Sequence, residues 1–155
     1  MKFIVDMNVG RLAVWLRALG YDTLFINPIE DDDLIEIARR EGRTILTKDT
    51  GILRRRVVTS GAVKALYVEG DDWRDQLAQV VRNLHLTRSP SFSRCLACNV
   101  PLEARTREEA RPHVPPFVHQ TQREFLTCPE CGRFYWKGTH WQRMTEELEQ
   151  AASRL

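Results

Sequence analysis

The four cysteines of this 155-residue chain occur as two CxxC pairs, Cys95/Cys98 and Cys128/Cys131, separated by twenty-nine residues. Each pair places two thiols on one tight turn, and two such turns supply the four thiolates of a closed tetrahedral zinc site. A site with no open position indicates a structural metal. The alternative is a redox dithiol, but that motif favours a helix start within a βαβ unit, and neither pair is placed there.

The predicted zinc site divides the chain into two parts. A segment of about 60 residues rarely builds a sufficient core without a metal or disulfide, so we predict two domains, 1–90 and 91–155, joined by a Ser- and Pro-containing linker at 87–94. The chain start shows no signal-peptide pattern, and no apolar run approaches the roughly 20 residues that span a bilayer. We therefore expect a cytoplasmic protein with no membrane partner, where paired CxxC motifs indicate metal rather than disulfides.

The first 90 residues alternate between strand and helix patterns. Apolar runs predict strands at 3–5, 22–26, 43–47 and 63–68. Helical spacing predicts helices between and after them, at 9–19, 31–41, through Arg54–Arg56 and at 71–84. This alternation predicts an α/β fold, in which a parallel sheet is covered on both faces to give three α/β/α layers. In the first helix Arg11 and Arg17 lie off the apolar stripe, so we expect both in solvent.

The second part has weaker patterns. Loops rich in Pro connect the two cysteine pairs, and short apolar runs at 125–127 and 134–136 flank the second pair as the strands of a zinc ribbon would. A final polar helix is predicted at 145–155.

Carboxylates stand at three related places in the first part. Asp6 and Asp49 each end a predicted strand, and Asp31–Asp33 begin the helix between them. Three carboxylates meeting at one point repel each other unless a cation neutralises them, and such oxygen ligands suit Mg²⁺ or Mn²⁺. The alternative is that all of them only cap the turns and the helix that follow. Spacing alone gives the two interpretations equal weight.

Basic residues follow the carboxylates closely. The net charge of +2 is too small to establish a nucleic-acid partner, so any basic surface must come from local clusters. Arg54, Arg55 and Arg56 begin five residues after Asp49, which favours contact with phosphates at the predicted site. Lys48 pairs either with a carboxylate or with a phosphate.

Several motifs carry a resemblance to a known family. Four segments resemble those of a PIN-like ribonuclease domain: Phe3-Ile-Val-Asp6-x-Asn8-Val, Leu19-Gly-Tyr-Asp22, Asp31-x-x-Leu-Ile-x-x-Ala38 and Thr44-Ile-Leu-Thr-Lys-Asp49. Two later segments resemble the zinc ribbon that is fused to such a domain in the mutator-seven C-terminal ribonuclease domain family. They are Arg94-Cys-x-x-Cys-Asn99 and the run from Cys128-x-x-Cys through Tyr135-Trp136 and His140 to Met144.

The resemblance implies a function and a set of site residues. It implies a metal-dependent endoribonuclease acting on RNA, with Asp6, Asp31 and Asp49 as catalytic ligands of Mg²⁺ or Mn²⁺ and with Asp32 or Asp33 as alternatives to Asp31. We expect the RNA to be single-stranded. Structural zinc would hold a ribbon that aids RNA binding. PIN domains have a further acid, for which Asp71 and Asp72 are the candidates. The alternative function is a non-catalytic RNA-binding adaptor that recognises RNA through the ribbon.

Overall fold

The computed structural model describes residues 1–87 and 91–153, with the side chains of 152 and 153 left out. Its first part is built on a four-stranded, fully parallel sheet in the order β2-β1-β3-β4. The strands are β1 (Lys2–Val5), β2 (Asp22–Leu24), β3 (Thr44–Thr47) and β4 (Ala65–Tyr67). The predicted parallel sheet is confirmed, although β2 and β4 are shorter than the apolar runs that predicted them.

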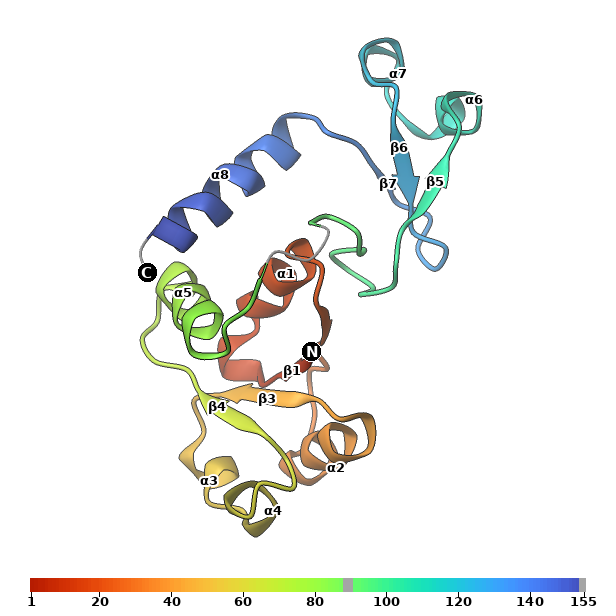
Figure 1. Ribbon diagram of the computed structural model, residues 1–155. Helices are drawn as coiled ribbons and strands as arrows, with labels where there is room; N and C mark the ends of the chain where they lie inside the picture. Colours follow the sequence, from red (N-terminus) through yellow and green to blue (C-terminus); the bar gives the residue numbers. More distant parts are fainter. Residues whose placement is uncertain (88–90, 154–155) are drawn as a thin grey trace.

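Helices cover both faces of this sheet (Figure 1). One face carries α1 (Arg11–Ala18) and α5 (Trp73–Asn83); the other carries α2 (Asp31–Glu41), α3 (Thr50–Leu53) and α4 (Arg56–Thr59). Successive strand residues point to opposite faces. Phe3, Val5 and Leu46 therefore join the core under α1 and α5, whereas Ile4 and Ile45 join the core under α2. The predicted three-layer α/β/α architecture is confirmed.

The predicted helix through Arg54–Arg56 is wrong. Helix α3 ends at Leu53, α4 begins at Arg56, and Arg55 between them has an extended backbone (φ −59°, ψ 136°). The reason is packing: Ile52 and Val57 both contact the core under α2. In one continuous helix two residues five apart would point about 140° away from each other, so the chain breaks to turn both inward.

The second part contains a three-stranded antiparallel sheet in the order β5-β6-β7. These strands are β5 (Glu103–Arg105), β6 (Phe125–Thr127) and β7 (Phe134–Tyr135). The connection from β5 to β6 holds α6 (Arg107–Ala110), the 3-10 turn η2 (Arg111–His113) and α7 (Pro116–Thr121), where the sequence indicated only loops. Ala110, Val114 and Phe125 form its small core.

The last helix, α8 (Thr139–Ser153), leaves the ribbon and packs beside α5 (Figure 1). Met144, Leu148 and Ala151 are buried in the same core as α1 and α5. Arg74 of α5 donates two hydrogen bonds to the Glu147 carboxylate, at 2.7 and 2.8 Å. The predicted polar helix at 145–155 is therefore longer toward its start and amphipathic, and residues 154–155 of that prediction lie outside the described part.

The division into 1–90 and 91–155 stays a prediction. Residues 88–90 of the predicted linker are outside the part of the chain that the structure describes. Among the described helices, none combines the length and the apolar character needed to cross a membrane.

Candidate active site and metal centre

Asp6 and Asp49 follow adjacent strands and share one hydrogen-bond partner. The Thr47 hydroxyl donates to Asp6 Oδ2 at 2.7 Å and accepts the Asp49 backbone N–H at 2.9 Å. Asp6 directly follows β1 and Asp49 lies two residues beyond β3, and these strands pair in parallel, so both acids lie at the carboxyl edge of the sheet. That edge is where active groups gather in open α/β sheets.

Both carboxylates also act as caps, as the alternative interpretation predicted. Asp6 Oδ1 accepts the Met7 N–H at 2.8 Å, and Asp49 Oδ1 accepts the Gly51 N–H at 2.7 Å. A Cβ at residue 51 would lie 2.9 Å from that same Asp49 oxygen, so glycine permits the close approach. Capping occupies only part of each carboxylate, which has about four lone-pair positions.

Asp31 is the third acid at this edge, and it does not cap its helix. Glu30 is the N-cap residue of α2, and no side-chain cap bond is made there. Partial burial, followed by repulsion from Asp49 and Asp6, raises the pKa of Asp31, while Arg55 opposes the change. The structure therefore brings the three predicted acids into one electrostatic neighbourhood.

The three carboxylates are not drawn tightly together. Among the described residues, the four cysteines are the only set of three or more potential ligands whose donor atoms all lie within 4.8 Å of one another. The role of Asp6, Asp31 and Asp49 as metal ligands therefore stays a prediction.

The two candidates for a further acid differ in their contacts. Asp71 is exposed and accepts a 2.6 Å hydrogen bond from Lys48 Nζ, which lowers the pKa of the Asp71 carboxyl. Asp72 caps α5 by accepting the Arg74 N–H at 2.8 Å, as its position before a helix predicted. Asp71 is therefore the acid tied to the Lys48–Asp49 segment.

The three predicted RNA-contacting arginines lie on the surface beside these acids. Arg54, Arg55 and Arg56 are all exposed. Arg55 pairs with Asp32 of α2 at 2.9 Å, which joins the loop after α3 to the start of the helix that carries Asp31. Exposed ion pairs of this kind contribute little stability, so Arg55 can exchange its partner at small cost.

The four cysteines converge as the spacing predicted, and their arrangement is consistent with a zinc ribbon. Cys95 Sγ and Cys131 Sγ are 3.8 Å apart. A tetrahedron with Zn–S bonds of about 2.3 Å has edges of roughly the same length. The donor set and its spacing therefore fit one tetrahedral ion.

The two cysteine turns share one backbone design. In each turn the second cysteine's N–H donates to the first cysteine's sulfur at 3.4 Å, and the following residue's N–H donates to the first cysteine's carbonyl at 2.9 Å. That following residue is left-handed in both turns: Gly132 at φ 75° and Asn99 at φ 68°. Asparagine is one of the few residues with a side chain that tolerates this conformation.

The thiols cannot all ionise without a cation. Burial opposes ionisation of Cys95, but hydrogen bonds from Tyr135 and from the backbone of Cys98 outweigh it and lower the pKa of Cys95 to about 7. Burial and hydrogen bonds with Cys131 and Cys128 raise the pKa of Cys98 to about 12. A metal ion removes this conflict because it binds deprotonated thiols.

Asn99 attaches the first cysteine turn to the edge of the parallel sheet. Its side-chain oxygen accepts the Thr23 N–H of edge strand β2 at 2.9 Å, and its amide donates to Asp22 at 2.7 Å. Asp22 also receives the buried Arg43 at 2.7 Å. The Asn99 side chain thus supplies an acceptor that an unpaired edge strand lacks.

Arg17 makes the second attachment, and the prediction that it lies in solvent is wrong. It is only 7% exposed. Its guanidinium donates to the Thr23 carbonyl at 2.9 Å and to the carbonyls of Leu96 and Ala97 at 2.8 and 3.2 Å. Arg17 lies off the apolar stripe because it faces the cysteine turn, whose carbonyls satisfy its charge.

Sequence comparison now identifies the family. The sequence model described as "Mut7-C RNAse domain" matches residues 1–148, nearly the whole chain. The chain belongs to this family. The human protein named "Exonuclease mut-7 homolog" is 35% identical over 102 residues, which are 63% of this chain and 12% of the human protein. No solved structure matches the chain.

Membership in the Mut7-C RNAse domain family confirms the predicted resemblance and indicates a nuclease-type function in general. The chain spans only 12% of the length of its human relative. The likeness to PIN domains stays a prediction.

Sequence reasoning missed the residues that join this Mut7-C chain's two sheets. Tyr135 is one: its hydroxyl lies 3.1 Å from Cys95 Sγ and accepts the Leu96 N–H at 3.2 Å. Asn99 is another, and a signal for it existed, because Asn99 and Gly132 occupy equivalent positions after the two CxxC pairs. An asparagine at a position that glycine fills elsewhere indicates a side chain with its own contacts.

Replacing Asp31 tests whether the three acids share one field. The raised pKa means that ionised Asp31 is less favourable in the folded protein than in the unfolded one. Asp31→Asn should therefore stabilise the protein at pH 7 in buffer without Mg²⁺ or Mn²⁺. The gain in the free energy of unfolding is full at pH values above the raised pKa of folded Asp31. It vanishes at pH values below the ordinary aspartate pKa of about 3.9. Denaturant unfolding at several pH values measures it.

Asp33→Asn is the matched control for Asp31→Asn. It removes a charge from the same first turn of α2, and therefore the same favourable helix-dipole interaction of about 0.3–1 kcal/mol. Asp31→Asn should exceed it in stability at pH 7 and equal it at about pH 3, below the ordinary pKa of an aspartate. Equal stabilities at both pH values would show that Asp31 is not repelled by Asp6 and Asp49.

Removing the metal should separate the ribbon from the parallel sheet. We expect about one zinc per chain by elemental analysis, and Cys98→Ser should lose it, because a hydroxyl does not replace a thiolate ligand. Chelation should then increase hydrogen exchange at the backbone amides around Arg17 and along β2. The amides of β3 should stay protected. Protection unchanged at β2 after zinc loss would contradict the coupling.

Asn99→Gly isolates the side chain that attaches the first cysteine turn. Glycine accepts the left-handed backbone at φ 68° without strain, so only the hydrogen bonds to Thr23 and Asp22 are lost. We expect a loss of about 1–3 kcal/mol in the free energy of unfolding, since a buried N–H is left without its acceptor. Arg111→Gly, an exposed change elsewhere in the ribbon, gives the background cost of a new glycine.

Proposed function

We propose that this protein is a divalent-metal-dependent endoribonuclease that hydrolyses phosphodiester bonds in single-stranded RNA. The observation that supports this most is the acidic edge of the parallel sheet, where one Thr47 hydroxyl orients Asp6 and Asp49 and where Asp31 is repelled by both. Family membership supports nuclease chemistry in general. The acids supply the donor set that the proposed chemistry requires.

Asp6, Asp31 and Asp49 fit Mg²⁺ or Mn²⁺ by the chemistry of their oxygens and by the charge that they hold near each other. Because their oxygens are spread apart, a hydrated ion suits them best: Mg²⁺ usually keeps several waters and is held through one or two carboxylates. When bound, such an ion would supply an activated water and neutralise charge on the scissile phosphate. No side-chain nucleophile is needed.

The protein's own residues would position the RNA beside these acids. Lys48 is held at the same edge by Asp71 and by the Gly70 carbonyl, with its Nζ 2.6 and 2.8 Å from their oxygens. Arg54, Arg55 and Arg56 form an exposed basic segment that begins five residues after Asp49. A phosphate near this segment would replace the exposed Asp32 and Asp71 partners, and the contact would weaken with salt.

A non-catalytic RNA-binding adaptor is the second candidate. The observation that favours it is that, in the described ranges, only the cysteines gather closely enough to share an ion in this geometry. In that case the ribbon would recognise RNA and the acidic edge would serve only to cap η1 (Met7–Val9) and α3.

Cleavage of labelled single-stranded RNA with Mn²⁺ separates the two candidates. Asp6→Asn and Asp49→Asn, compared with wild type at matched zinc content, should each reduce the cleavage rate by about a hundredfold, because each would lose about 2.7 kcal/mol of metal-assisted stabilisation of the transition state. Asp33→Asn should cleave as wild type does. A circular RNA tests internal cleavage, because an enzyme that requires an end cannot open it.

The outcomes are distinct. Equal rates in wild type, Asp6→Asn and Asp49→Asn would place any cleavage at another site. Binding of RNA without cleavage in all four proteins would favour the adaptor. Degradation of linear RNA with the circle intact would replace the endonuclease by an exonuclease at the same acids.

A further inference from the structure

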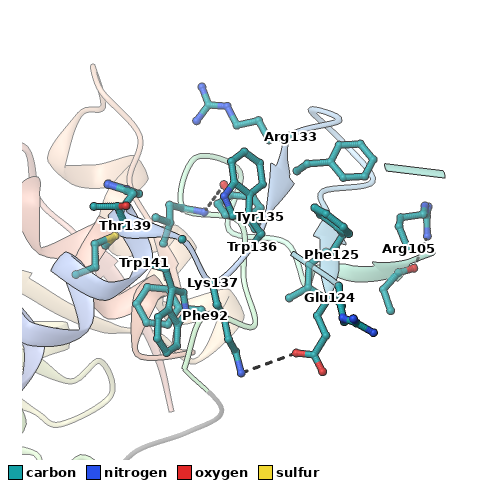
Figure 2. A pocket seen from close by; sticks show the side chains of 18 of the residues that line it. Phe92, Arg105, Glu124, Phe125, Arg133, Tyr135, Trp136, Lys137, Thr139 and Trp141 are labelled. Atoms are coloured by element: carbon teal, nitrogen blue, oxygen red, sulfur yellow. Dashed lines mark hydrogen bonds and ion pairs between the residues drawn. The ribbon is translucent and has the colours of Figure 1, made fainter. Parts of the chain in front are cut away.

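A large cavity lies on the ribbon side of the molecule, away from the acidic edge. It measures about 1060 Å³ and is lined by the ribbon sheet, by residues 91–92 and by the start of α8 (Figure 2). All of its lining residues lie after residue 90, so none of Asp6, Asp31 and Asp49 contributes to it. Its volume is at the upper limit for pockets that enclose a drug-sized molecule. The cavity therefore has room for a segment of a polymer.

Aromatic rings form much of its wall. The ring centres of Phe92 and Trp141 are 5.3 Å apart with their planes tilted by 47°, and Trp136 lies on the segment between β7 and α8 (Figure 2). Both tryptophans and Phe92 are only half-buried. Phe92 keeps a left-handed backbone, φ 58°, that is rare for a bulky residue, and its N–H is anchored on the Ala18 carbonyl at 2.8 Å. The ring is thus held at the cavity by strong local constraint.

The charged residues of the lining are mostly basic. Arg105, Arg123, Arg133 and Lys137 line the cavity against a single acid, Glu124, although the whole chain carries only +2. Arg123 and Arg133 are exposed, and within the described residues neither is ion-paired to a carboxylate. The Lys137–Glu124 pair is long, 3.9 Å, and largely exposed, so it contributes little. The Lys137 ammonium also lies 5.6 Å from the centre of the Trp141 ring, a contact that a stacked base would replace.

We propose that this cavity binds single-stranded RNA, with unpaired bases stacked on Trp141, Phe92 and Trp136 and the backbone phosphates on Arg123, Arg133 and Lys137. Half-buried rings reach base faces only where the bases are unpaired, and aromatic platforms beside cationic side chains are how single strands are held. The excess of positive charge opposes an apolar protein partner. The choice of RNA over other single strands rests on the proposed function.

The cavity also depends on the metal centre. The Tyr135 ring lines it, and the Tyr135 hydroxyl contacts Cys95 Sγ at 3.1 Å. The ribbon would thus be a second RNA contact whose shape the cysteine cluster fixes, and it would hold the strand while a distant part of that strand reaches the acidic edge.

The test is binding of a 5′-fluorescein oligouridylate of about 12 nucleotides, within the usual site size for single strands. Fluorescence anisotropy follows it on the full zinc-loaded chain carrying Asp49→Asn, so that cleavage does not intervene. Arg123→Glu and Arg133→Glu should each weaken binding about tenfold and flatten its salt dependence. Lys64→Glu, an equally exposed reversal outside the cavity, is the matched control and should stay within about twofold of the parent.

Stacking is tested separately from charge. Trp141→Ala should weaken binding about tenfold without changing the salt dependence, and Trp141→Phe should restore most of it because a phenyl ring still stacks. If Trp141→Ala loses zinc or unfolds, the two exposed arginine variants still decide the question. An unlabelled duplex of equal length should compete poorly.

Results that would overturn the cavity proposal are clear. They are binding by both arginine variants equal to that of Lys64→Glu, or competition by duplex RNA as strong as that by the single strand. Cleavage in chains with intact Asp49 is measured separately. Metal-dependent cleavage together with unaffected cavity variants would remove only the cavity proposal, whereas impaired cavity variants without any cleavage would remove only the nuclease.

Discussion

The attachment of the first cysteine turn to strand β2 determines how the two sheets of this molecule are joined. Asn99 completes the hydrogen bonding of the edge strand, and Arg17 reaches from α1 to two carbonyls of the turn. Burial lowers the pKa of the Arg17 guanidinium, although the nearby Cys95 and Cys98 thiols oppose this change. A buried arginine is tolerated only where acceptors are fixed in place, and the cysteine turn fixes them.

A metal ion held by the four cysteines would have a role beyond the ribbon. The ion would hold Cys95 and Cys98 in the tight turn that presents the Leu96 and Ala97 carbonyls to Arg17. Asp22 transmits the same network inward, because Arg43 donates to Asp22 and to the Phe3 carbonyl of β1 at 3.1 Å. Burial by itself would raise the pKa of the Asp22 carboxyl. Hydrogen bonds from Arg43 and Asn99 outweigh this effect, so the pKa of Asp22 is lowered. A chain of polar contacts therefore runs from the cysteine cluster to the central strand.

The acidic edge shows how one residue can serve both as a cap and as part of a site. Asp6 and Asp49 accept backbone N–H bonds at the starts of η1 and α3, and these bonds orient both side chains. The Thr47 hydroxyl then connects them, while Asp31 faces their charge without a capping bond of its own. The geometry of these acids is compatible with both a capping and a ligand role, since a cap bond orients a carboxylate and leaves lone pairs for an ion.

Much of this architecture follows from sequence, because it depends on local periodicity and fixed spacing. The alternation of strands and helices gave the parallel sheet, the CxxC spacing gave the cysteine cluster, and the positions of Asp6 and Asp49 after strands placed them at one edge. Tertiary contacts alone decided the rest: the burial of Arg17, the bonds of Asn99, the break at Arg55 and the packing of α8 on α5. Periodicity indicates that a residue has a neighbour on one side of its own segment. The identity of that neighbour depends on residues far away in the chain, such as Leu96 for Arg17 and Thr23 for Asn99.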